Sequence, residues 1–430
     1  MVNPPIVNII GKLNYVLFCA MLIALPLPRM ILQPVAVAFI ISWLLELRFL
    51  PVGKHNLQIY KFTNLQIEKA LPGALLTCLA LWEAISLAWA PDTQAGLSMI
   101  NRHWPFVILV LIPLFGFNEH YKSHKVLSVL FASCVASVPL YLFTYYWVWN
   151  YDAVIWFRPD LIRPFEFPGF HGITSLMKLR GYYCLVLLLS IFSTPLLYRH
   201  YRQIYSRTDV ILTLGIGVAV MLAGMLMTGS RTAIMTFVIT AIFLLFVTYR
   251  KRIRWWWQLL IVVAGLGVGI ASFVLNPRFD TLLNTDIHNL NLSEASELNE
   301  PRPYLWATVL THWEEYGFFG LGAGQHSEFM MNQFREAGND YFLAQKFGPH
   351  SQYLSTWMCL GPLAVLLLLA AFVAIPRVYN GRAHYMAHAV AFLFAFSILY
   401  DDLLERMDSI LILIIWLVLL PLIESEPEKS

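Results

Sequence analysis

Apolar segments about as long as a membrane is thick recur through most of the chain. A transmembrane helix needs about 20 consecutive, predominantly apolar residues. Segments of this kind run over 13–28, 30–47, 70–89, 104–118, 125–149, 177–198, 209–228, 230–249, 255–275, 351–375, 384–400 and 407–423. Charged residues make up only 13% of the chain, whereas soluble domains carry about 25%. The sequence therefore predicts an all-α polytopic membrane protein with about 12 transmembrane helices.

The longest polar interval, residues 276–350, divides these segments into two groups. It is too rich in Gly, Asn, Glu and Arg to span a bilayer. Helical patterns over 304–316 and 327–336 are separated by a glycine-rich stretch. We therefore expect three regions: transmembrane helices one to nine over 1–275, a helical loop subdomain over 276–350, and transmembrane helices ten to twelve with a tail over 351–430.

Basic residues favour one side of the predicted bundle. Twelve helices put both termini on one side, and more than half of the 29 lysines and arginines fall in the short loops of that side. Short cytoplasmic loops are enriched in Lys and Arg, so we expect both termini to be cytoplasmic and 276–350 to face the periplasm or cell exterior. No basic stripe lies on a soluble module, which argues against nucleic-acid binding.

Two arginines at the outer ends of predicted helices suggest an anion site. Arg231 follows a tight turn in a Gly-Ser-Arg-Thr sequence, and arginine at membrane depth must pair or face an aqueous cavity. The hydroxyls of Ser230 and Thr232 and the first amides of the helix add donors that favour an anion. Arg180, one turn inside its own segment, should reach the same depth. Guanidinium groups bind phosphate oxygens in a bidentate manner, so the pair suggests a diphosphate or another polyanion.

One histidine and an acidic turn lie at the same predicted face. His350 stands directly before the 351–375 segment, and a histidine at the water–lipid boundary can accept a proton near neutral pH. Asp401 and Asp402 begin the turn between the last two segments, where carboxylates must be hydrated or paired. They are placed to orient the arginines or to bind sugar hydroxyls. We therefore expect His350 to act as a base. No pair of histidines has metal-ligand spacing, so we expect no metal.

Structural roles are the alternative for each of these residues. Arg231 would then be an interfacial anchor, and Arg180 would form an ion pair with Glu166 or one of the two aspartates. His350 would be a structural histidine. Asp401 and Asp402 would belong to a hydrated turn.

In their order along the chain, the motifs resemble those of the O-antigen ligase/polymerase superfamily of bacterial membrane proteins. The resemblance covers roughly residues 175 to 420 and rests on Gly229-Ser230-Arg231-Thr232, Arg302 with Trp306, the glycines 320, 322 and 324, Pro349-His350-Ser351-Gln352-Tyr353-Leu354, and the acidic segment Asp401, Asp402 and Glu405. Ser351 departs from the pattern, because the family often has asparagine after the histidine.

The resemblance implies a glycosyltransferase of the GT-C type in the bacterial inner membrane, with its active site facing the periplasm. The donor would be an undecaprenyl-diphosphate-linked glycan, and the acceptor a sugar hydroxyl of lipid A–core, as in the ligases of lipopolysaccharide assembly. Arg180, Arg231 and Arg302 would bind the diphosphate without a metal or another cofactor, and His350 would deprotonate the acceptor. No second nucleophilic carboxylate is evident, so a single displacement would invert the anomeric centre.

Two other functions remain open at this point. An O-antigen polymerase would use a second lipid-linked glycan as its acceptor. A transporter of lipid-linked glycans would belong to a different class, and it predicts charged residues and broken helices near the bilayer midplane. The charges here cluster at the outer ends of the predicted helices, which favours the glycosyltransferase.

Overall fold

The structure, a computed structural model, is helical throughout the part of the chain that it describes. That part comprises residues 4–27, 29–49, 64–107, 120–144, 180–228, 230–249, 292–295 and 301–425, with five single residues between 254 and 267. No strand occurs within these ranges. The predicted all-α class is therefore confirmed.

Six of the described helices are long and apolar enough to cross a membrane, judged by length and composition. They are α5 (Ser123–Thr144), α7 (Arg180–Tyr201), α8 (Arg207–Met227), α16 (Gln352–Val378), α17 (Gly381–Tyr400) and α18 (Met407–Ser425). Shorter apolar stretches lie in α1 (Pro4–Ala24), α2 (Arg29–Phe49) and α9 (Arg231–Tyr249). Most of the predicted spans 104–118 and 255–275 falls outside the described residues, so the count of twelve stays a prediction.

The sequence analysis did not predict the helix that follows α3 (Asn64–Ser86). This short helix, α4 (Thr93–His103), is capped by Asp92, whose side chain accepts hydrogen bonds from the backbone N–H groups of Gln94 and Ala95. Residues 104–107 then form a 3-10 turn. The predicted span 104–118 therefore does not begin as an α-helix at residue 104.

The polar segment 301–345, part of the predicted 276–350 interval, forms a small helical subdomain. It contains α12 (Pro301–Thr311), α13 (Trp313–Tyr316), α14 (His326–Glu336) and α15 (Asp340–Gln345). These helices share a core of their own that includes Leu305, Val309, Met330, Phe334 and Phe342, all fully buried. Such a core gives the subdomain a fixed shape, because the packed side chains leave the helices few alternative arrangements.

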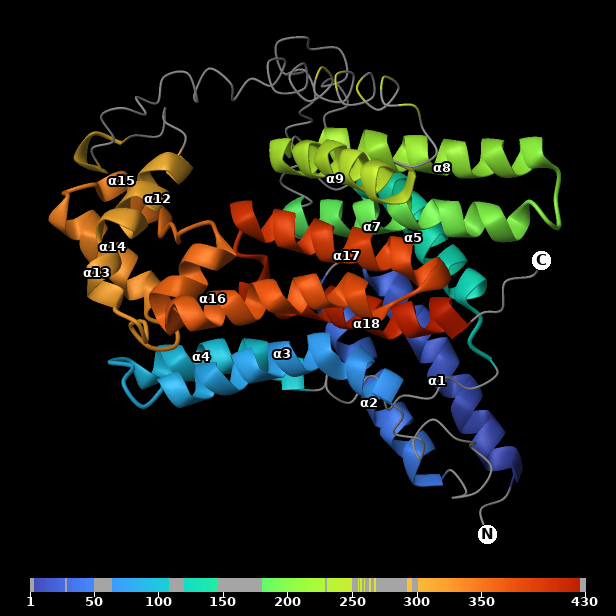
Figure 1. Cartoon of the computed structure of the whole chain (residues 1–430), viewed down its shortest axis with the longest axis horizontal. Coiled ribbons are helices and arrows are strands. Elements are labelled where there is room, and N and C mark those ends of the chain that lie inside the picture. Colours follow the sequence, from blue (N-terminus) through green and yellow to red (C-terminus); the bar gives the residue numbers. More distant parts are fainter. Residues whose placement is uncertain are drawn as a thin grey trace.

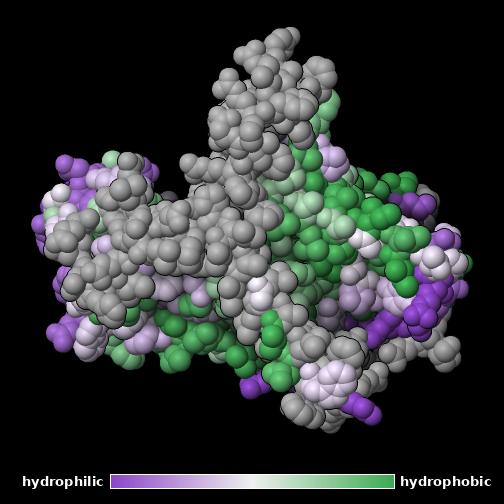
Figure 2. Space-filling view, turned by 90° about the horizontal axis from the view of Figure 1, so that it is seen from above, coloured by the Kyte–Doolittle hydropathy of each residue, from purple (hydrophilic) through white to green (hydrophobic). Residues whose placement is uncertain are grey.

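The long helices run along the molecule between two polar ends. The α12–α15 subdomain lies at one end, and both termini lie toward the other (Figure 1). Helix α16 packs against α3 on one side and α17 on the other, and α7 and α18 are the most enclosed of the six spans. Hydrophobic residues form a belt between hydrophilic surfaces at the two ends (Figure 2). This pattern is typical of a protein that crosses a bilayer.

Helix α16 is broken at Gly361, where the glycine-rich segment of the subdomain docks onto it. Gly361 has φ 77° and ψ 178°, a backbone conformation that is essentially restricted to glycine. The backbone N–H groups of Leu321 and Gly322 donate to the carbonyls of Met358 and Cys359 at 2.8 and 2.9 Å. A Cβ atom on Gly361 would collide with the carbonyl oxygen of Phe318. The glycines thus allow the backbone of the glycine-rich segment to lie directly against the backbone of α16.

Gly361→Ala should lower the free energy of unfolding by about 2 kcal/mol or more, because it combines a strained φ with a backbone collision. Gly338 is the matched control: it also has a positive φ, of 66°, but nothing lies within 4 Å of its Cβ position. Gly338→Ala should cost only about 1 kcal/mol. Denaturation midpoints in detergent measure both. Equal losses for the two variants would show that the docking contact adds nothing to stability.

Candidate functional site

A small cavity lies where the first turns of α7 and α9 meet the last turn of α17. Its lining includes Gly181 from α7, Thr232 and Thr236 from α9, and Tyr400 and Asp401 at the end of α17. A Cβ atom on Gly181 would lie 3.0 Å from Oδ2 of Asp401, so the absence of a side chain lets the carboxylate approach the helix. Side faces of α7 and α9 and one carboxylate therefore line the same space.

Arg180 and Arg231 are the first residues of α7 and α9. Residues 145–179 lie outside the described part, so the predicted position of Arg180 one turn inside its helix stays a prediction. The side chains of both arginines lie outside the described part, so the diphosphate role stays a prediction. Their backbone positions are one residue from Gly181 and Thr232, which line the cavity.

Ser230 has a structural role at the start of α9. Its hydroxyl accepts a hydrogen bond from the backbone N–H of Ala233 at 3.3 Å and lies 3.1 Å from the hydroxyl of Thr232. This is the geometry of a helix N-cap. The cap satisfies one of the N–H groups that have no partner within the helix at this end.

Arg302 joins the subdomain to this cavity. It lies in the first turn of α12, and its Nε donates a hydrogen bond to the carbonyl of Tyr400 at 3.2 Å. Tyr400 itself lines the cavity. The structure thus brings Arg302 to the end of α17, next to the helix starts that carry the other two predicted arginines.

His350 has a strained backbone at the entry to α16. Its φ is 50°, a conformation that costs a residue with a side chain about 1–3 kcal/mol. Trp306 holds the segment in place: its Nε1–H donates to the carbonyl of Pro349 at 3.0 Å. The Trp306 ring also packs on the ring of Tyr400, with centroids 5.9 Å apart. Trp306 therefore links the backbone beside His350 to a residue of the cavity wall.

Asp402 lies against the segment that carries His350. Its Oδ1 accepts a hydrogen bond from Ser355 at 2.7 Å, and its Oδ2 lies 3.5 Å from where a Cβ on Gly348 would be. Its backbone N–H donates to Oδ1 of Asp401 at 2.9 Å. Burial raises the pKa of Asp402 to about 6, although the Ser355 hydrogen bond and His326 oppose this. The carboxylate is thus partnered within the protein and does not belong to a simple hydrated turn.

Asp402 should make the protein less stable as the pH rises from about 4 to above 6. The folded state holds the Asp402 proton up to about pH 6, whereas an unfolded aspartate loses it near pH 3.9. The folded state binds more protons in that window, so stability falls as the pH rises. Asp402→Asn removes this contribution, and the difference in melting temperature, variant minus wild type, should grow between pH 4 and 7. A constant difference would contradict the raised pKa.

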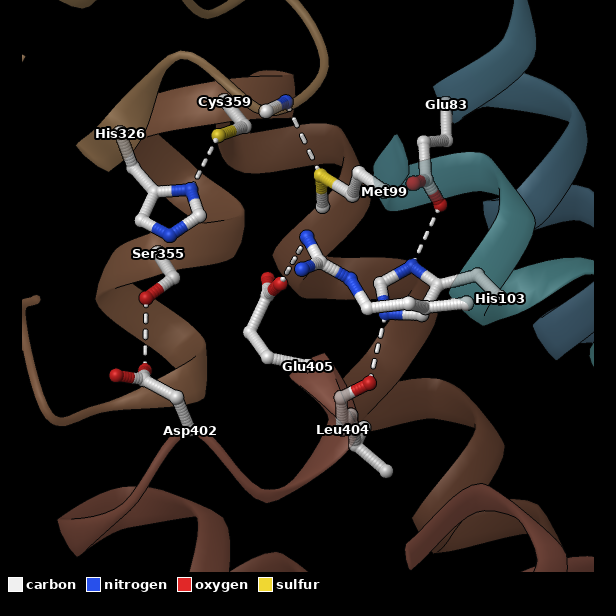
Figure 3. A network of polar contacts seen from close by, with 11 residues as sticks. Glu83, Met99, His103, His326, Ser355, Cys359, Asp402, Leu404 and Glu405 are labelled. Atoms are coloured by element: carbon white, nitrogen blue, oxygen red, sulfur yellow. Dashed lines mark hydrogen bonds and ion pairs between the residues drawn. The ribbon is translucent and has the colours of Figure 1, made fainter. Parts of the chain in front are cut away.

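A second polar network, beside Asp402, was missed by the sequence analysis (Figure 3). The His103 ring lies 2.7 Å from Oε2 of Glu83 through Nδ1 and 2.7 Å from the carbonyl of Leu404 through Nε2. Both partners are acceptors, so His103 donates from both nitrogens and is held as an imidazolium. Arg102 forms an ion pair with Glu405 at 3.0 Å. The network fastens the 3-10 turn η5 (Leu403–Glu405) to α3 and α4.

Opposite charges in this network stabilise one another's ionised forms. Burial opposes ionisation of both His103 and Glu405. Glu83 nevertheless raises the pKa of His103, and interactions with His326, His103 and Arg102 bring the pKa of Glu405 below its ordinary value. A buried acid in an apolar segment, as Glu83 is, was the available sequence signal. His326, which the sequence analysis did not single out, belongs to this group.

The described ranges contain no group of three or more His, Cys, Asp or Glu side chains that is suited to hold a metal ion. The carboxylates of the site instead have protein partners: Asp402 has Ser355, and Glu405 has Arg102.

Comparison with known families gives one match. Residues 216–369 match the family described as O-antigen ligase. The matched region begins inside α8 and ends inside α16, so it includes the start of α9, the whole helical subdomain and the His350 segment. No curated protein matches the chain.

Proposed function

We propose that this chain, whose residues 216–369 match the O-antigen ligase family, is a membrane glycosyltransferase that transfers a glycan from undecaprenyl diphosphate to a sugar hydroxyl of lipid A–core. The proposal places the reaction at the end of the molecule that carries the α12–α15 subdomain. That end faces the periplasm in the proposed topology, with both termini in the cytoplasm of the inner membrane.

One observation carries the proposal. The first turns of α7 and α9 and the end of α17 meet around a cavity lined by Gly181, Thr232 and Asp401, at the end of the helical bundle where α16 begins. Arg302 and Trp306 join the subdomain to the same place through Tyr400 and Pro349. A lipid-bound donor and a lipid-bound acceptor can reach such a site laterally, between the helices.

The proposed reaction is a single displacement. The acceptor hydroxyl oxygen attacks the anomeric carbon, and His350 takes the hydroxyl proton. The bond between the anomeric carbon and the diphosphate oxygen breaks, and the electron pair leaves with undecaprenyl diphosphate. Arg180, Arg231 and Arg302, together with the helix N-termini, stabilise the charge that develops on that oxygen. Attack from the face opposite the leaving group inverts the anomeric configuration.

The strained backbone of His350 fits this role. Strain at a single residue persists only where the surroundings hold it, and it is frequent at active sites. Here the hydrogen bond from Trp306 to Pro349 and the ring of Phe347, with its centroid 5.7 Å from that of His350, fix the segment. A base held in one orientation loses little entropy when the acceptor arrives.

The test is an assay with two acceptors. Purified protein in nanodiscs receives one undecaprenyl-diphosphate-linked glycan, labelled in the sugar, with either lipopolysaccharide that lacks O-antigen or further lipid-linked glycan. We expect label on the lipopolysaccharide and release of undecaprenyl diphosphate. Elongation of the lipid-linked chain instead would assign the protein as a polymerase. If label reaches neither acceptor, the proposed reaction is wrong.

A further inference from the structure

A groove at the end of the molecule opposite the candidate site is open between three helices. Its floor is α17, and its walls are α9 and α16, both of which pack against α17. The groove has a volume of about 450 Å³. None of the residues discussed above for glycan transfer lines it, so it calls for an explanation of its own.

The groove is polar at one end and apolar along the rest of its length. Arg377, His384 and His388 line the polar end, close to the turn that joins α16 to α17. Farther along, Leu369 and Ala395 line it nearer the middle of their helices. His384 and Ala395 are about 16 Å apart along the α17 axis, at 1.5 Å per residue. That distance is about half of the 30 Å hydrocarbon core, which is the depth of one leaflet.

The polar end carries unneutralised positive charge and two accessible ring nitrogens. In the described part of the chain no carboxylate lies within ion-pair distance of Arg377, and the nearby Glu424 is paired with Lys69. The Nδ1 atoms of His384 and His388 donate to the carbonyls of Tyr379 and His384, at 3.1 and 2.9 Å. Each Nδ1 therefore carries the hydrogen, and each Nε2 is left to accept a hydrogen bond from a bound group.

The two histidine rings lie next to each other, with centroids 4.4 Å apart, so one bound headgroup can reach both. Beyond them the floor is aromatic: Phe243 stacks on Phe392 with centroids 4.2 Å apart. A phosphate suits Arg377, a headgroup hydroxyl suits the histidine nitrogens, and an acyl chain suits the aromatic and aliphatic floor. An anionic phospholipid with a hydroxyl-bearing headgroup has these three parts in this order.

We propose that the groove binds an anionic phospholipid with a hydroxyl-bearing headgroup, such as phosphatidylglycerol, from the leaflet opposite the candidate site. Its phosphate lies at Arg377, its headgroup hydroxyls at His384 and His388, and one acyl chain along the α17 floor. Basic pockets between membrane helices are a recurrent way of binding anionic headgroups. This site is separate from glycan transfer, and it does not depend on the proposed reaction.

The test uses the full chain in phosphatidylcholine vesicles that contain a small fraction of phosphatidylglycerol with a diazirine in one acyl chain. After illumination, label should map to peptides of α16 and α17. The double variant Arg377→Gln/His384→Gln should reduce that label at least fivefold. Val373→Trp, at an exposed position on the groove wall, should reduce it by filling the apolar part. Arg207→Gln, at an exposed helix start outside the groove, should leave it unchanged.

Three results would overturn the proposal. The first is equal labelling by diazirine-bearing phosphatidylcholine, because it would show that the anionic headgroup is not recognised. The second is label that persists in both Arg377→Gln/His384→Gln and Val373→Trp. The third is loss of label in the presence of millimolar inorganic phosphate, which would assign the polar end to free phosphate and not to a lipid. Insertion of each variant is checked by its elution as a single species in detergent.

Discussion

Replacing His350 by alanine should lower the rate of glycan transfer by about 10²- to 10⁴-fold, the usual contribution of a general base. The variant loses the group that accepts the acceptor proton, but the arginines and helix ends that bind the donor remain. Binding of the lipid-diphosphate donor should therefore be nearly unchanged. A transfer assay with saturating donor, together with a donor-binding titration, separates the two effects.

His312→Ala is the matched control for this experiment. His312 belongs to the same subdomain, and its Nδ1 bonds only to the local groups of Thr308 and Thr311. Its removal should leave transfer within about twofold of wild type, because an exposed local hydrogen bond contributes little. If His350→Ala retains full activity while inserting normally, His350 is not the base.

Replacing Arg231 by alanine should also lower transfer, by about 10²- to 10³-fold, the range found when one group that stabilises developing negative charge is removed. Here donor affinity should fall as well, since the guanidinium meets the diphosphate both before and during the reaction. Arg231→Lys should recover only part of the activity, because lysine keeps the charge but not the bidentate geometry. Steady-state rates over a range of donor concentrations give both quantities.

Arg335→Ala controls for the loss of a positive charge at this end of the molecule. Arg335 is exposed and forms a surface ion pair with Glu328 at 3.2 Å, and such pairs contribute little. Its replacement should leave transfer unchanged. Equal losses in Arg231→Ala and Arg335→Ala would mean that Arg231 acts only through the general electrostatic field and not by contact with the donor.

Much of the architecture was predictable because it follows local pattern. Apolar runs of membrane length predicted α7, α8, α16, α17 and α18 closely, and the 3.6-residue periodicity of 327–336 predicted α14. The cap of α4 is equally local, since Asp92 stands directly before the helix.

The rest of the site could not be predicted, because its contacts join residues far apart in the chain. His103 and Leu404 are 301 positions apart, and no local pattern reports that they touch. The glycines at 320, 322 and 324 are visible in the sequence, but the cause of the requirement is not. A side chain at these positions would collide with the backbone of α16 or of the α3–α4 region, and only the fold brings these segments close. Arg302 and Tyr400, which form a hydrogen bond, are likewise 98 positions apart.

The measurement that tests the central claim most directly is photo-crosslinking of the donor. An undecaprenyl-diphosphate-linked glycan with a diazirine beside the diphosphate is bound to the purified protein, illuminated and mapped by mass spectrometry. We predict label on peptides that carry the starts of α7 and α9 and the end of α17, including Thr232 and Tyr400, and its loss with excess unlabelled undecaprenyl diphosphate. Displaceable label confined to helices away from this cavity, such as α5 and α8, would contradict the proposed site.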